Sequence, residues 1–166
     1  MRLFVLLAAL AIAQPAAAQQ LTSEQVVENV IYDVIRPGFE RFNENAAAFE
    51  ADMQRLCDTP TKQLRVVARA QFGYVVHAWS QIELLRIGPL LDANRSERIL
   101  FWPDRKGIAL RQVQGVLAEA DESAADPATL AGKSVALQGL GALEFVLFGT
   151  GNEALATAEG NFRCRY

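Results

Sequence analysis

The 166-residue sequence predicts an all-α protein, an up-and-down helical bundle with a kinked first helix. Apolar residues recur every three or four positions through most of the chain, which is the period of one helix face. Capping residues, prolines and glycines divide these stretches into pieces of helical length. No run of about four to eight β-branched residues alternates with polar ones, so no strand is expected.

The first helix is expected to start at Thr22, because Gln25 three positions later completes the residue pattern of a capping box. Pro37 should interrupt or kink this helix, because proline removes an amide hydrogen bond and clashes with the preceding turn. Beyond Pro37 the apolar residues follow the seven-residue period of helices that pack side by side. The apolar residues before and after the proline are Val26, Val27, Val30, Ile31, Val34 and Ile35, then Phe39, Phe42, Ala46, Phe49, Met53 and Leu56.

A second helix can be capped by Asp58 or Thr59, with Pro60 in its first turn. It should run to about Ile87, where a Gly-Pro pair stops it. Its expected core-facing residues are Leu64, Ala68, Phe72, Val75, Trp79, Ile82 and Leu85.

The segment 94–105 is expected to connect the second and third helices, with the Phe101 and Trp102 rings folded back on the bundle. A third helix is expected over about 107–120. A fourth should follow the Asp-Pro start signal at 126–127, in two pieces around Gly132, the second piece spanning 134–148.

Residues 1–18 have the charged start, apolar run and small-residue end of a secretory signal peptide, which leaves a mature domain of residues 19–166. We expect this domain to be exported to the bacterial periplasm. No later apolar run reaches about 18 residues, so no membrane span is expected in it. The acidic net charge of −3 becomes −4 without the signal, which argues against nucleic acid as a partner. In an oxidising compartment Cys57 and Cys164, the only two cysteines, should form one disulfide.

His77, the single histidine, is the first candidate metal ligand. Its neighbours at helical spacing include no carboxylate, thiol or imidazole, so other helices would have to supply the remaining ligands. The alternative is a half-buried histidine that hydrogen-bonds across the bundle.

Glu144 is the second candidate, because it lies among leucines and phenylalanines. A buried carboxylate must find a partner, a metal or a proton. The helix-interior glycines Gly139 and Gly141 indicate a close approach by a neighbouring helix or a ligand. Two alternatives remain, tight helix packing with an arginine or amide partner for Glu144, or a polar functional pocket.

The segment 138–149, QGLGALEFVLFG, resembles the signature of imelysin-like proteins, a family also described as peptidases and as iron-regulated envelope proteins. Further similarity lies at His77–Trp79, Leu85–Pro89, Arg98–Asp104 and the two cysteines. The resemblance implies a helical, exported protein of bacterial iron uptake, with iron or another divalent metal as a cofactor. The family's G-x-H-x-x-E site motif falls on Gly139, Gly141 and Glu144, so glycine stands at the histidine position.

The resemblance leads to three expectations of function. The first is a non-catalytic binding or accessory protein of iron or haem uptake, with an envelope protein as partner. The second is a metal-dependent peptidase that uses Glu144. The third is an inactive half of a longer protein, because the family has two helical bundles and the similarity covers the N-terminal one, so that the partner would be the second bundle.

Overall fold

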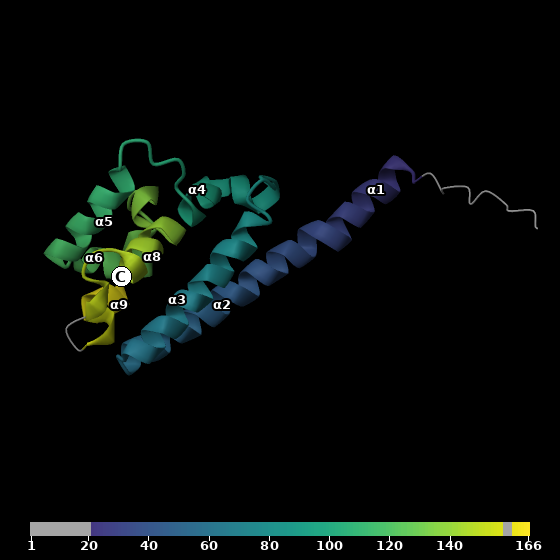
Figure 1. The fold of residues 1–166 in the computed structure, drawn as a ribbon. Helices are drawn as coiled ribbons and strands as arrows, with labels where there is room; N and C mark the ends of the chain where they lie inside the picture. Colours follow the sequence, from purple (N-terminus) through teal and green to yellow (C-terminus); the bar gives the residue numbers. More distant parts are fainter. Residues whose placement is uncertain (1–20, 158–160) are drawn as a thin grey trace, which may run out of the picture.

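The computed structural model describes residues 21–157 and 161–166, and the predicted signal peptide lies outside these ranges. All regular elements in the described residues are helices, which confirms the all-α fold class. Two long helices form an antiparallel hairpin, and a lobe of shorter helices packs on one side of it (Figure 1). None of the described helices combines the length and the apolar character that a membrane span requires.

The first long helix is a rod of three segments, α1 (Ser23–Asn29), the π-helical η1 (Val30–Ile35) and α2 (Arg36–Asp58). The predicted capping box is confirmed, with the Gln25 amide donating to Thr22 Oγ1 at 3.2 Å and the Thr22 amide donating to Gln25 Oε1 at 3.0 Å. Pro37 does not end the helix. The disturbance takes the form of the π-helical segment just before it, because a wider turn accommodates a proline that cannot donate an amide hydrogen bond.

The two halves of the rod differ in what covers them. Phe49 and Leu56 of α2 are buried against α3 (Lys62–Ser80). The N-terminal part extends past the end of α3 (Figure 1), and Val26, Val27, Val30 and Val34 are exposed. The valines of the apolar face predicted before Pro37 therefore have no cover from the described residues, whereas Ile31 and Ile35 are half-buried.

Both ends of α3 differ from the prediction. Thr61 caps it by accepting from the Leu64 amide at 3.1 Å, because the non-helical backbone of Thr59 before Pro60 keeps the proline outside the helix. The helix ends at Ser80 rather than near Ile87. The chain turns here because Ile82, 1% exposed, packs on Gly38, where a Cβ would lie 2.5 Å from its Cγ2.

The connector contains η2 (Gly88–Asn94) and α4 (Arg95–Ile99), and α5 (Ile108–Glu119) confirms the third predicted helix. Phe101 is half-buried, but Trp102 is 75% exposed, so the expectation that both rings fold back on the bundle was wrong for the tryptophan.

The predicted start of the fourth helix is confirmed, because Asp126 caps α7 by accepting from the Ala128 amide at 3.0 Å. The predicted 134–148 helix is instead divided before Gly139, which has a φ of +70° and lies against the backbone carbonyls of Arg98 and Ile99. Only glycine adopts this conformation without strain and leaves room for that contact. The elements of this part are α6 (Glu122–Ala125), α7 (Pro127–Leu130), η3 (Val135–Leu137), α8 (Gly139–Phe148), η4 (Asn152–Ala156) and α9 (Asn161–Arg165).

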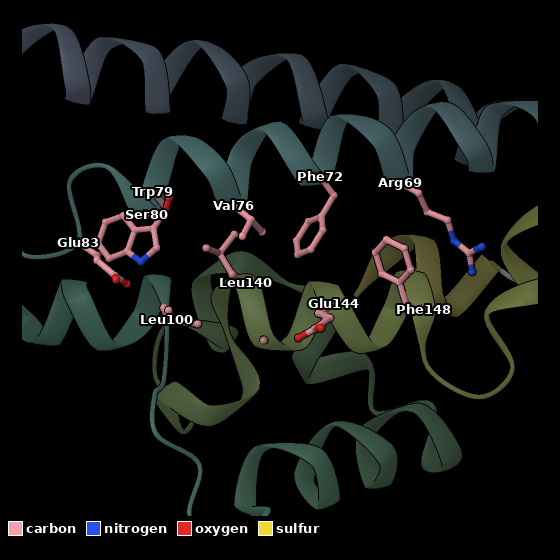
Figure 2. A pocket seen from close by; sticks show the side chains of 12 residues that line it. Arg69, Phe72, Val76, Trp79, Ser80, Glu83, Leu100, Leu140, Glu144 and Phe148 are labelled. Carbon is pink, nitrogen blue, oxygen red and sulfur yellow. The ribbon is translucent and has the colours of Figure 1, made fainter.

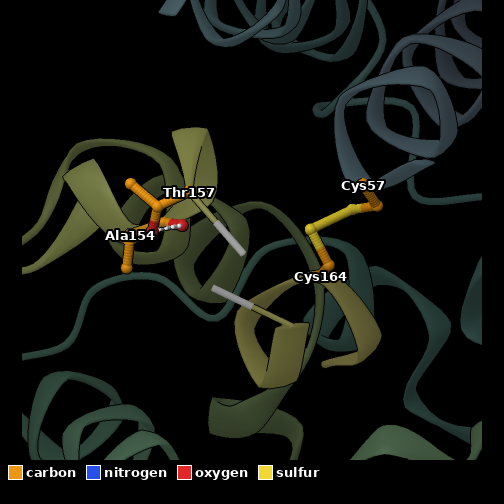
Figure 3. The surroundings of a disulfide bond; sticks show 4 residues. All are labelled: Cys57, Ala154, Thr157 and Cys164. Carbon is orange, nitrogen blue, oxygen red and sulfur yellow. Dashed lines mark hydrogen bonds between the residues drawn. A yellow bond between two sulfur atoms is a disulfide. The ribbon is translucent and has the colours of Figure 1, made fainter. Parts of the chain in front are cut away.

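The predicted disulfide is present and joins the end of α2 to α9, with 5.5 Å between the Cα atoms of Cys57 and Cys164 (Figure 3). It fastens the last helix to the hairpin. The main core lies between the hairpin and α8, where Leu56, Leu147 and Leu155 have no exposed surface. A smaller core joins α5 and α8. Helix α8 is thus packed on two sides, and its remaining face lines the candidate site.

Candidate ligand-binding groove

Helix α8 positions Glu144 by burying its other faces. Leu140, Val146 and Leu147 are in the core, whereas Glu144 is exposed. The expectation of a buried, partnered carboxylate was wrong, because Glu144 shares a helix face with Gly141 and with Phe148, which is 48% exposed. No described residue donates a hydrogen bond to the Glu144 carboxylate or forms an ion pair with it.

A cavity of about 410 Å³ lies between α3 and α8 (Figure 2). Its walls are mostly apolar, with Arg69 near one end, Glu83 near the other, and Glu144 on the α8 side between them. The α3 residues recur at helical spacing, so one helix face supplies that wall. The lining residues are Arg69, Phe72, Gly73, Val76, Trp79, Ser80, Glu83, Leu100, Leu140, Gly141, Glu144 and Phe148.

A second cavity of about 410 Å³ lies on the other side of Glu144, against the 100–104 segment and α5. Leu100, Gly141, Glu144 and Phe148 line both cavities. A Cβ at Gly141 would meet no heavy atom within 4 Å outside its own helix turn, so the space beside this glycine is open. We call the two cavities together the Glu144 groove. Their volumes lie in the range typical of small-molecule sites.

Two further polar groups in the groove have no partner among the described residues. Glu83 is half-buried, and its carboxylate accepts no hydrogen bond and forms no ion pair there. Trp79 is 4% exposed, and its indole nitrogen is buried without an acceptor. In Figure 2 this nitrogen is directed toward the groove side of α3. A buried donor without an acceptor costs about 1–3 kcal/mol. Arg65 Nε and Gln112 Oε1, which line neither cavity, are also buried without a described partner.

Arg69, in contrast, has hydrogen-bond partners and has a structural role. Its Nε donates to the carbonyl oxygen of Leu147 at 2.8 Å, and its guanidinium lies 4.9 Å from the centre of the Phe148 ring. A second guanidinium nitrogen donates to Asn152 Oδ1, and the Asn152 amide donates to the carbonyls of Phe148 and Gly149. These bonds tie α3 to the C-terminal end of α8 and so hold the groove open.

His77 lies outside the groove. It is exposed, its carbonyl accepts the Ser80 hydroxyl hydrogen bond at 2.8 Å, and its imidazole has no hydrogen bond within the described residues. The expectation of a half-buried histidine bonded across the bundle was therefore wrong. The structure does not bring His77 to Glu144, and in 21–157 and 161–166 no three or more His, Cys, Asp or Glu side chains are grouped as a metal site would need.

Sequence reasoning identified Gly141 and Glu144 but missed Glu83, Trp79 and Arg69 as members of the same site. A signal was present, because residues 69, 72, 73, 76, 79, 80 and 83 follow the period of one helix face. The residues at that period include both core and groove residues, and only the tertiary packing shows which of them line the groove.

The groove lies within the part of the chain that resembles known proteins. A peptidase family model described as Imelysin matches residues 35–166, which is more than three quarters of the chain. The match starts at the end of η1 and includes α3, α8 and both cysteines. No curated protein and no solved structure matches the chain.

Proposed function

The chain belongs to the imelysin family, and from this premise we propose that it is an exported, periplasmic binding protein of bacterial iron or haem uptake. The ligand would bind in the Glu144 groove. The observation that carries the proposal is the state of Glu144, an exposed carboxylate without a described protein partner, placed between two cavities with apolar walls. Such a site combines apolar contact area with a few polar groups that orient a ligand.

The donor set favours binding over metal-dependent hydrolysis. A catalytic zinc site uses three protein ligands, commonly histidines with a carboxylate, and keeps one position open for water. The groove offers Glu83 and Glu144, but the family motif has glycine at its histidine position, Gly141, and His77 lies elsewhere. The residues of the groove therefore do not fit a resident catalytic metal.

Titration of the purified 19–166 domain with ferric citrate and with haem tests the proposal, using calorimetry and, for haem, the absorption spectrum. We expect at least one of the two to bind, and Glu144→Gln to change its affinity. Glu44→Gln removes the same charge from an exposed position of α2 that lines neither cavity of the groove, so it should behave like the parent. No binding of either compound would refute the iron-uptake function.

Export is tested separately in a Gram-negative host. We expect the tagged protein in the periplasmic fraction, with a mature N-terminus after residue 18. Recovery in the cytoplasm with an intact N-terminus would refute the proposed localisation.

A metal-dependent peptidase is the second candidate, favoured by the peptidase family match. It requires cleavage of a denatured protein substrate that stops with a chelator and with Glu144→Ala. Chelator-insensitive cleavage, or none at all, would exclude it.

A further inference from the structure

We propose that the Glu144 groove selects an organic cation, a small molecule with an apolar body and an ammonium group. The inference rests on the proposed binding role of the groove and adds the charge and shape of the ligand. It does not depend on iron, and because haem and ferric citrate carry carboxylates, the groove should bind them more weakly than the cation.

The carboxylates without protein partners determine the charge that a ligand of the groove should carry. Arg69 is the positive group at the groove. Its guanidinium already donates hydrogen bonds to the Leu147 carbonyl and Asn152 and lies over the Phe148 ring. Glu83 and Glu144 have no such partners within the described residues, and both line the α3–α8 cavity. An ammonium group beside either carboxylate gains a charge-assisted hydrogen bond, whereas an anionic ligand meets like charge.

The walls decide the shape of the ligand. Phe72, Val76, Leu140 and Phe148 line the cavity on its two long sides (Figure 2). A flat or extended apolar body would bury this surface, which contributes roughly 25 cal/mol per Å² removed from water. A bare metal ion or methylammonium leaves the walls uncovered, so the apolar body is part of the specificity.

The space beside Gly141 gives a ligand room to reach both cavities of the groove. At Gly141 the missing side chain leaves open space where the two cavities meet. A larger residue there would divide the groove, and its Cβ would meet no atom within 4 Å outside its own helix turn.

Phenethylammonium chloride is the probe, with methylammonium and 3-phenylpropionate as matched controls that lack the apolar body or reverse the charge. Calorimetry should give a dissociation constant of about 1 mM or lower for the probe and at least tenfold weaker binding for both controls. In two-dimensional NMR spectra the probe should shift the indole N–H signal of Trp79, which lines the α3–α8 cavity, and methylammonium at the same concentration should not. Glu83→Gln and Glu144→Gln should each weaken binding by about threefold to fivefold, and Glu44→Gln should not.

Gly141→Leu should abolish probe binding by filling the groove, with circular dichroism checking that the variant folds. Equal binding of phenylpropionate or methylammonium, or no effect of Gly141→Leu, would overturn the inference. The experiments distinguish failure of the iron function from failure of the cation inference. Binding of haem or ferric citrate without the probe would leave the iron function and remove the cation inference, whereas binding of the probe alone would do the reverse.

Discussion

The two glycines of the α8 signature provide the sharpest test of the fold, because replacing each by alanine should change stability in opposite directions. At Gly139 the φ of +70° costs an alanine about 1–2 kcal/mol. Its Cβ would also overlap the carbonyl oxygens of Arg98 and Ile99 and lie 2.7 Å from the Ile99 carbonyl carbon. These are backbone atoms of α4, so the helices must separate, at a cost of about 1–3 kcal/mol. The expected loss is about 2–5 kcal/mol.

Gly141 is the matched control. It lies two residues later in the same helix, and a Cβ there has nothing within 4 Å outside its own helix turn. Alanine at a helix-interior position is favoured over glycine by up to about 1 kcal/mol, since it restricts the unfolded chain. Gly141→Ala should therefore stabilise the protein by about 0.5–1 kcal/mol.

Urea denaturation followed by far-ultraviolet circular dichroism measures both variants, with the disulfide intact in each. The difference between their unfolding free energies should exceed about 2 kcal/mol. Equal effects, or a loss of stability at Gly141 as large as that at Gly139, would refute the arrangement of α4 against the start of α8.

Three further predictions concern stability. Reduction of Cys57–Cys164 should lower the unfolding free energy by about 2–4 kcal/mol, since the bridge spans a sequence separation of 107; a double alanine variant should not respond to dithiothreitol in the same denaturation assay. Tyr166 donates to the Leu137 carbonyl at 2.7 Å, and burial raises its pKa to about 12 from 10.0. The protonated Tyr166 hydroxyl therefore adds to the free energy of unfolding below pH 10, and this stabilisation is lost as pH rises through 12. Tyr166→Phe should remove the pH dependence of the unfolding free energy across that range, measured by urea denaturation. Asn152→Leu should cost about 2–4 kcal/mol in thermal or urea unfolding, because it leaves polar groups of α3 and α8 unpaired, and an unchanged free energy would contradict that role.

Local signals in the chain were sufficient for the fold class, the capping box at Thr22, the third helix and the start signal at Asp126. Each depends on residues within a few positions of one another, so the chemistry of capping and proline acts before any packing. The disulfide was also predictable, because the chain has two cysteines and an oxidising compartment was expected from the sequence.

Helix ends were predicted less well where tertiary contacts decide them. Nothing local requires α3 to stop at Ser80, and the turn follows from the packing of Ile82 on Gly38, far away in the sequence. Likewise, Gly139 and Gly141 look equivalent in the sequence, yet one meets the backbone of α4 and the other faces open space.

The sequence by itself determined which residues share a helix face, because helical period depends on spacing alone. Only the tertiary structure decided which face is covered. It left the valines before Pro37 and the ring of Trp102 exposed, and it turned Glu144 out of the core into a groove shared with Glu83. Burial depends on the surface that meets a face, and that surface comes from residues distant in the chain. The candidate site of this imelysin-family protein therefore became visible only when α3 and α8 were placed side by side.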